Sequence, residues 1–302
     1  MPVNKRYRAQ VDLLIRCLPA VAKVRTFALK GGTAINLFHY DMPRLSVDID
    51  LTFLPITNRD TALTKITEGL ATIGKEIQRT IPQVQIRATG TDAPKLQIAT
   101  PQARIKMEPS PISRGILFPP IERDLCQAAQ DEYELFVRVQ RLATGDLYGG
   151  KLCAALDRQH PRDLFDIRQL LDTGEISDNI RQAFVVYLAG HRRPMAELLS
   201  PKRIPIEQLY THHFAGMTAH AIGLDELEAT REQMFAWVLT ALSENERKFL
   251  LSIKQGEPDW SLMPFDHIQQ LPAIQWKLRN VQRMSANAHK AALDRLRDVL
   301  DF

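Results

Sequence analysis

The amino-acid sequence predicts an α/β (α+β) fold, in which a region of strands and helices is followed by a mostly helical region. Within residues 26–108, runs with the period of two that is typical of strands alternate with stretches that carry apolar residues at three- and four-residue steps, the spacing of an amphipathic helix. From about Val137 onward, the helical spacing dominates. We therefore predict two domains, residues 1–136 and residues 137–302.

The composition limits the classes of protein to which the chain can belong. A chain of 302 residues with 45% hydrophobic and 25% charged residues is long enough to bury a sizeable core. Its formal net charge of +4 permits a polyanionic partner without requiring one. Three widely separated cysteines without a C-x-x-C pair indicate reduced thiols in a cytoplasmic protein, and neither zinc nor disulfides. We expect no signal peptide and no membrane partner, because no apolar run is long enough to span a membrane.

The predicted elements have a definite order along the chain. In the first domain we expect helices at 11–24, 33–39 and 58–80, and strands at 26–29, 45–54, 84–88, 95–100 and 103–108. A proline-rich loop follows at 109–120. In the second domain we expect helices at 145–157, 162–172, 225–255 and 274–300. The capping-box spacing of Ser243 and Glu246 allows the third of these to restart at Ser243.

The segment from Leu29 to Leu51 carries the strongest functional signal. Gly31-Gly32-Thr33 leads into a short helix, and Asp48-Ile49-Asp50 lies in an otherwise apolar strand. The period of two places Asp48 and Asp50 on one face, where two carboxylates repel each other without a cation. A bound Mg²⁺ or Mn²⁺ usually relieves this repulsion, and Mg²⁺ is commonly bound together with substrate phosphates. The N–H groups of a glycine turn at a helix N-terminus can bind such a phosphate.

Taken alone, each of these motifs is weak. A D-x-D sequence is more often a solvated strand end or a turn, and a Gly-Gly pair also makes ordinary turns. No P-loop or G-x-G-x-x-G sequence is present. The order of the two motifs along the chain, with a short helix between them, favours a site for a metal and a phosphate.

Glu108 is a candidate third acid. It lies on the polar face of a predicted strand that could neighbour Asp48 and Asp50, and a third carboxylate would complete a two-metal site. The alternative is a surface glutamate that pairs with Lys106 or Lys95. The sequence favours neither interpretation over the other.

A predicted helical hairpin supplies a second group of candidates. Lys151 lies at the shoulder of an apolar stripe, where it could snorkel to solvent or neutralise nucleotide phosphates. Asp163 falls on the expected buried face, but it also lies in the first turn of its helix, where an acid is stabilising in any protein. Arg162 and Asp166 share a neighbouring, half-exposed face. These four residues form a candidate second half of an active site, with Lys151 and Arg162 as its phosphate-binding groups.

Basic residues are frequent near the C-terminus. By default they form a solvated helix face, and because aromatic residues are sparse nearby they indicate phosphate contact more than base stacking. The residues are Lys277, Arg279, Arg283, Lys290, Arg295 and Arg297.

Taken together, these motifs resemble the AbiEii-type nucleotidyltransferases, the toxin halves of type IV toxin–antitoxin (abortive-infection) systems, which are related to the MenT toxins and more distantly to DNA polymerase β. The resemblance is carried by KGGTAINL, RLSVDIDL, RIKME, GGKLCAAL and RDLFDIRQLL in this order, and by the C-terminal stretch ERKFLLSIKQGEPDWSLMPF. It covers most of the chain. It implies a polymerase-β-type nucleotidyltransferase core with a mixed sheet, followed by a helical domain that completes the active site.

The resemblance also implies roles for individual residues. The family's glycine motif falls on Gly31 and Gly32, with Thr33 at a position often held by Ser or Thr, and its metal-binding motif falls on Asp48-Ile49-Asp50. Its essential lysine matches Lys151, and its later aspartate matches Asp163 or Asp166. The sequence differs from the family in two respects: the gap between Gly31-Gly32-Thr33 and Asp48-Ile49-Asp50 is longer than in the polymerase-like consensus, and Glu108 stands where many nucleotidyltransferases have Asp.

The implied activity is metal-dependent transfer of a nucleoside monophosphate from an NTP to an acceptor. The resemblance points to the 3′ end of tRNA as the acceptor and to a cognate antitoxin as a protein partner. Two alternatives remain at this stage. The same core could transfer the nucleotide to a protein hydroxyl, or the chain could be a non-catalytic NTP-binding module.

Overall fold

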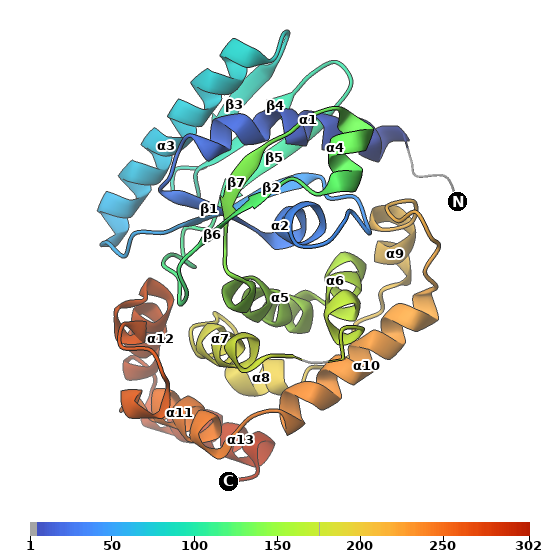
Figure 1. Cartoon of the computed structure of the whole chain (residues 1–302). Coiled ribbons are helices and arrows are strands. Elements are labelled where there is room, and N and C mark those ends of the chain that lie inside the picture. Colours follow the sequence, from blue (N-terminus) through green and yellow to red (C-terminus); the bar gives the residue numbers. More distant parts are fainter. Residues whose placement is uncertain (1–4, 175) are drawn as a thin grey trace. The chain divides into compact units, whose positions relative to one another are not determined.

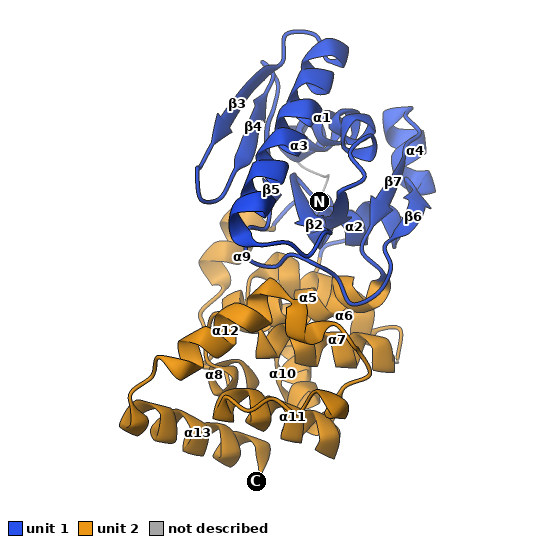
Figure 2. Cartoon of the chain, turned by 90° about the vertical axis from the view of Figure 1, so that its left-hand side faces the viewer, with its two compact units in different colours: residues 1–143, 215–221 blue, residues 144–214, 222–302 orange. Residues whose placement is uncertain are grey.

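A computed structural model describes residues 5–174 and 176–302 (Figure 1). The chain forms two compact units, coloured separately in Figure 2. Unit 1 comprises residues 1–143 and 215–221, and unit 2 comprises residues 144–214 and 222–302. The division at 136/137 expected from the sequence thus lies seven residues before the change of unit at 143/144, and a short later segment returns to unit 1.

Unit 1 is built on a seven-stranded mixed sheet with the order β3-β4-β5-β2-β1-β7-β6. Strands β2 and β5 pair in parallel, as do β1 and β7, and the other neighbours are antiparallel. This confirms the prediction of a mixed α/β fold. The strands are β1 (Phe27–Lys30), β2 (Asp48–Phe53), β3 (Gln85–Thr89), β4 (Lys95–Ala99), β5 (Arg104–Pro109), β6 (Ile121–Asp124) and β7 (Arg138–Arg141).

Four helices accompany the sheet in the described part of unit 1: α1 (Lys5–Ala22), α2 (Gly31–Phe38), α3 (Arg59–Thr80) and α4 (Gln127–Tyr133). Helices α1 and α3 pack against each other and against strands β3, β4 and β5. They cover the face on which Leu96, Ile98 and Met107 are buried. The side-chain alternation of a strand places the neighbouring polar residues on the opposite face. The short helix α2 contacts β1 and β2, which carry the glycine turn and the carboxylates.

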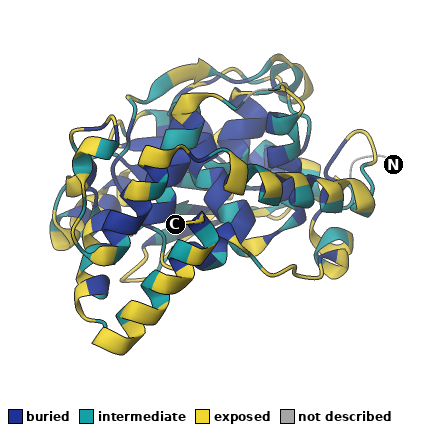
Figure 3. Cartoon of the chain, turned by 90° about the horizontal axis from the view of Figure 1, so that it is seen from below, coloured by how far each residue is buried: buried dark blue, intermediate teal, exposed yellow. Residues whose placement is uncertain are grey.

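Unit 2 is helical. It contains α5 (Thr144–Arg158), α6 (Pro161–Leu171), α7 (Asp178–Ala189), α8 (Met195–Leu199), α9 (Glu207–His213), α10 (Leu224–Thr240), α11 (Glu244–Gln255), α12 (Pro272–Gln282) and α13 (Ala286–Leu300), with short 3₁₀ turns at Trp260–Leu262 and Ile268–Gln270. Helices α5 and α7 lie in close contact, and Gly149 permits this approach, because an added Cβ would lie 2.7 Å from the Phe184 backbone nitrogen. Figure 3 shows the buried interiors in dark blue.

The chain beyond Val137 is mostly helical, as expected, but β7 was not expected, because it has only one apolar residue, Val139, between polar neighbours. The stretch 225–255 is two helices, and α11 restarts at Ser243, as the capping-box spacing allowed, because the Ser243 hydroxyl accepts from the Glu246 N–H. The expected helix at 274–300 also breaks, because Ser285 caps α13. That break lacks a capping-box glutamate, so the sequence gives little sign of it.

Across the described ranges, no helix is long and apolar enough to cross a membrane.

Candidate active site

The glycine turn joins β1 directly to α2. Gly31 has a φ of +69°, a left-handed conformation that glycine adopts without strain, and a Cβ at this position would overlap the Asp50 Oδ2 atom. A Cβ at Gly32 would meet the Arg44 guanidinium and the Ser46 hydroxyl. The conformation of Gly31 therefore favours glycine strongly, whereas a Cβ at Gly32 would displace the flexible end of Arg44. The first N–H groups of α2 have no partners inside the helix and favour an anion.

The two carboxylates lie on one face of β2. Asp48 and Asp50 are half-buried, whereas Ile49 between them is fully buried. The parallel register with β5 pairs Asp50 with Glu108, so the three carboxyl groups share one face of neighbouring strands. Two half-exposed carboxylates on one face suit Mg²⁺ or Mn²⁺, because Mg²⁺ usually takes one or two protein carboxylates together with water and substrate phosphates.

Glu108 has the partners that its alternative interpretation requires. Its carboxylate lies 3.4 Å from the Lys95 Nζ and 3.9 Å from the Lys106 Nζ. No cluster of three or more His, Cys, Asp or Glu side chains poised to hold a metal occurs in residues 5–174 and 176–302. The metal role of Glu108 therefore stays a prediction, although its register position beside Asp50 is favourable.

Thr33 anchors the carboxylate strand. Its side chain is fully buried, and its hydroxyl lies 2.6 Å from the Asp48 carbonyl oxygen and 2.9 Å from the Ser46 Oγ. A hydroxyl carries a single hydrogen, so donating it to Asp48 fixes the start of β2 against α2. The backbone N–H of Thr33 remains in the first turn of α2, where a phosphate contact was predicted.

Sequence reasoning did not single out Arg44, although it stands in the quoted segment RLSVDIDL. The side chain is buried, with 3% of the residue exposed, and its Nη1 donates to the Leu45 carbonyl at 2.8 Å. Its other terminal nitrogen lies against Gly32, at the N-terminus of α2. A buried guanidinium there adds positive charge to the partial charge of the helix N-terminus.

In unit 2, Lys151 of α5 joins both candidate aspartates of α6. The Lys151 Nζ lies 2.7 Å from Asp166 Oδ2 and 3.2 Å from Asp163 Oδ1. The lysine side chain is 6% exposed, so it does not snorkel to solvent. Arg158 adds a second cation, 2.8 Å from Asp163 Oδ2. Burial alone would raise the pKa of the Asp163 carboxyl, but the charges of Lys151 and Arg158 outweigh it and hold that pKa below its usual value.

Helix α6 is held at its N-terminus by His160 and Pro161. The His160 Nδ1 accepts from the Arg162 N–H at 3.1 Å, and Pro161 occupies the first turn, as predicted. Burial lowers the pKa of His160 to about 4, which keeps the ring neutral so that Nδ1 can accept this hydrogen bond. Arg162 is half-buried, but Asp166, expected on the same half-exposed face, is fully buried because it pairs with Lys151.

The predicted site residues therefore form two sets. Gly31, Gly32, Thr33, Asp48, Asp50 and Glu108 come together in unit 1, whereas Lys151, Arg162, Asp163 and Asp166 lie on the α5–α6 hairpin of unit 2. Within each set the structure gives the contacts described above.

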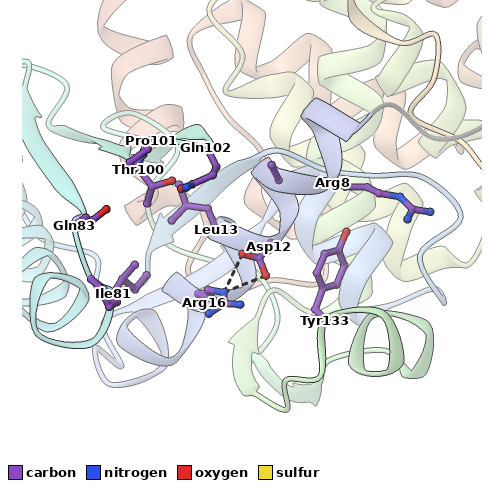
Figure 4. Close-up of a pocket in the computed structure, with 12 residues that line it drawn as sticks. Arg8, Asp12, Leu13, Arg16, Ile81, Gln83, Thr100, Pro101, Gln102 and Tyr133 are labelled. Carbon is purple, nitrogen blue, oxygen red and sulfur yellow. Dashed lines mark hydrogen bonds and ion pairs between the residues drawn. The ribbon is translucent and has the colours of Figure 1, made fainter.

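A pocket elsewhere in unit 1 contains none of these residues (Figure 4). It is lined by α1 and by the loops around Ile81 and Pro101. Its charges are largely balanced by ion pairs, because Arg16 lies 2.9 Å from Asp12 and Arg8 lies 3.0 Å from Glu132. This pocket therefore offers little net charge to an ionic ligand.

The basic residues of the C-terminal helices divide into two kinds. Lys277 is buried, and its Nζ donates to the carbonyls of His191 at 2.6 Å and Arg193 at 2.9 Å. Burial also lowers the pKa of Lys277 to about 8, so this residue tethers α12 and is not available to a phosphate. Arg279 and Arg283 are exposed.

Comparison with known proteins gives a consistent result. A family model described as "Nucleotidyl transferase AbiEii toxin, Type IV TA system" matches residues 12–280. Among solved structures, MenT4, a nucleotidyltransferase toxin from Mycobacterium tuberculosis H37Rv, is similar with a TM-score of 0.61 over 92% of this chain and 95% of that chain, at 15% identity. At this identity the structural likeness concerns the fold. No curated protein matches the chain.

Proposed function

The chain belongs to the AbiEii family of nucleotidyltransferase toxins of type IV toxin–antitoxin systems, and on that premise we propose that it transfers a nucleoside monophosphate from an NTP to the 3′ end of a tRNA. The observation that carries the proposal is the face of β2, where the half-buried Asp48 and Asp50 share one side and the Asp50 carboxylate lies against the glycine turn that begins α2. Carboxylates for a cation and N–H groups for a phosphate are thus adjacent in one unit.

In this proposal unit 1 binds the triphosphate. Asp48 and Asp50 would hold Mg²⁺ or Mn²⁺, with Glu108 as a further ligand, and a cation bound there would supply positive charge for the phosphates and the reacting oxygens. The N–H groups of Gly31–Thr33 bind the β- and γ-phosphates. The buried Arg44 beside Gly32 adds positive charge to the same place.

The α5–α6 hairpin supplies the remaining groups. Lys151 and Arg162 offset the charge that develops on the phosphates. Asp163 or Asp166 positions the acceptor hydroxyl and takes its proton. The acceptor oxygen then forms a bond to the α-phosphorus, the bond between the α-phosphorus and the bridging oxygen breaks, and pyrophosphate leaves. The lowered pKa of Asp163 makes it a weaker base, because it is held as a carboxylate between Lys151 and Arg158.

Charge and thiol state support the choice of partners. The net charge of +4 and the exposed Arg279 and Arg283 are compatible with a polyanionic acceptor. We place the protein in the cytoplasm, the reducing compartment that holds NTPs and tRNA; its three cysteines are free. Membership in a type IV toxin family implies an antitoxin as a further partner.

The test is incubation of the protein with each α-labelled NTP, Mg²⁺, a tRNA pool and cell extract. We expect label on the tRNA 3′ end, and Asp50→Asn should reduce this labelling by about a thousandfold, because the triphosphate loses its cation. Glu68→Gln removes one exposed carboxylate from α3 and is the matched control, with unchanged labelling. Label on a protein would identify nucleotidylylation of a protein instead. Growth inhibition that survives Asp48→Ala would indicate a non-catalytic binding module.

A further inference from the structure

The polar face of strands β3, β4 and β5 continues the face that carries the carboxylates. The register pairs Arg87 with Gln97, Gln97 with Lys106, and Lys106 with Asp48. Residues paired in this way point to the same side of a sheet, so this row runs from β3 across to the D-x-D strand. With strands about 4.8 Å apart, Arg87 lies about 14 Å from Asp48 along the row.

The opposite side of the same strands is covered. Ile86 of β3 and Leu96 of β4 lie close to Gly74 of α3, and Ile105 and Met107 of β5 are buried. Because side chains alternate, Arg87, Gln97 and Lys106 must project from the side that α3 does not cover. In Figure 2, helices α1 and α3 of unit 1 both lie on one side of the β3–β4 hairpin.

This polar face is strongly cationic. Across β3, β4 and β5 it carries Arg87, Lys95, Arg104 and Lys106 against a single carboxylate, Glu108. Glu108 lies nearest to Lys95 and Lys106. Within residues 5–174 and 176–302, no carboxylate lies within ion-pair distance of Arg87 or Arg104, and both arginines are exposed. Several other exposed arginines of unit 1 do have acidic partners, such as Arg138 with Asp124 and Arg59 with Asp92.

We propose that this cationic face, defined by Arg87, Lys95, Arg104 and Lys106, binds the sugar–phosphate backbone of the acceptor RNA strand next to the carboxylates. The row of Arg87, Gln97 and Lys106 that ends at Asp48 would hold the strand along the sheet, with its 3′ hydroxyl directed to β2. Contacts of this kind go to phosphates and therefore position a strand without reading its sequence. This inference rests on the proposed function. It adds the surface of unit 1 that binds the acceptor RNA.

The experiment measures RNA binding without NTP, so that it does not depend on catalysis. A short fluorescein-labelled single-stranded RNA with a free 3′ hydroxyl is titrated with the full chain over a series of KCl concentrations. Arg87→Gln/Arg104→Gln should weaken binding about tenfold at moderate salt and reduce the slope of log K against log[salt] by about 1.4, or about 0.7 for each lost phosphate contact.

The matched control removes the same charge from the other side of the same sheet. Lys65 and Lys75 are exposed on α3, so Lys65→Gln/Lys75→Gln changes the net charge equally without touching the cationic face. This control should keep the affinity and the slope within twofold of the unchanged chain. Arg87→Lys/Arg104→Lys restores the charge and should restore most of the binding.

Turnover gives a second, independent reading. In Arg87→Gln/Arg104→Gln the KM for RNA should rise and kcat should stay unchanged, because the variant leaves β2 and the glycine turn intact. If the unchanged chain labels RNA but the double variant keeps the affinity and the salt slope, the inference is wrong and the proposed function stands. If the double variant loses binding but the unchanged chain labels no RNA, the surface is correct and the proposed transfer to RNA is wrong.

Discussion

In unit 1 the candidate carboxylates are half-exposed and are positioned by backbone register, whereas in unit 2 the candidate lysine and aspartates are buried and are held by one another. Asp48 and Asp50 alternate with buried apolar residues on β2, and Thr33 fixes the start of that strand. Lys151, Asp163 and Asp166 form a network in which each charge neutralises another. The charges of the first arrangement are half-exposed, whereas those of the second are buried and paired with one another.

The difference has an energetic consequence. A buried charge that loses its partner destabilises a protein strongly, because the remaining group stays desolvated without compensation. Half-exposed carboxylates that crowd one another incur no such cost when one is removed. Substitution should therefore lower the free energy of unfolding much more in the second set than in the first, and the predictions below follow from that contrast.

The largest effect is expected for Lys151→Ala. Removing this ammonium leaves Asp163 and Asp166 buried beside each other, so the free energy of unfolding should fall by about 3–5 kcal/mol. Asp50→Ala should change it far less. Urea denaturation followed by circular dichroism measures both. If Lys151→Ala and Asp50→Ala lowered the free energy of unfolding equally, the proposed contrast between the two sets of residues would be wrong.

A smaller effect is expected at the glycine turn. Gly31→Ala places a Cβ at a φ of +69° and against the Asp50 carboxylate, so it should cost about 1–2 kcal/mol and also reduce nucleotidyl transfer. Gly150→Ala is the matched control in unit 2, because open space surrounds this helical glycine. That control should gain about 0.5–1 kcal/mol. A Gly31→Ala protein with normal stability and activity would contradict the close approach of Asp50.

Thr33 separates anchoring from phosphate binding. Thr33→Val leaves the Asp48 carbonyl without its hydroxyl donor and should cost about 1–1.5 kcal/mol. Thr33→Ser keeps the hydroxyl, and we expect normal stability and a normal KM for NTP. Thermal unfolding and steady-state kinetics measure the two properties. If Thr33→Val kept full stability and only the KM for NTP rose, the hydroxyl would be a phosphate ligand and no anchor.

The smallest effect concerns the cap of α6. The pKa of His160 is lowered from 6.5 to about 4 in the folded state, so the folded state binds fewer protons between these values. The stability that neutral His160 contributes is present above pH 6.5 and is lost as the pH falls toward about 4. His160→Asn caps the helix without titrating. Relative to this variant, the unchanged chain should lose stability on acidification, and parallel pH profiles would contradict the role of His160.

Local patterns were enough to predict the local structure of residues 29–51, for a physical reason. The glycine turn, the short helix and the carboxylate strand are consecutive in the chain, and the period of a strand is enough to place Asp48 and Asp50 on one face. The sequence also indicated Pro161 as a first-turn residue and the restart of α11 at Ser243. It missed β7 and the break before α13, because a four-residue strand and an isolated serine cap carry too little pattern to be distinguished from their surroundings.

The sequence alone determined which residues are candidates and, through the ordered motifs, the family to which they point. Local periodicity and the order of motifs are properties of the chain itself, so no folded structure is needed to recognise them. Only the tertiary structure decided that Glu108 lies in register with Asp50, that the Arg44 guanidinium lies against Gly32, and that Lys151 is buried between two aspartates. Each of these contacts joins elements that are separate in the chain, and strand pairing and burial between such elements leave no local signal.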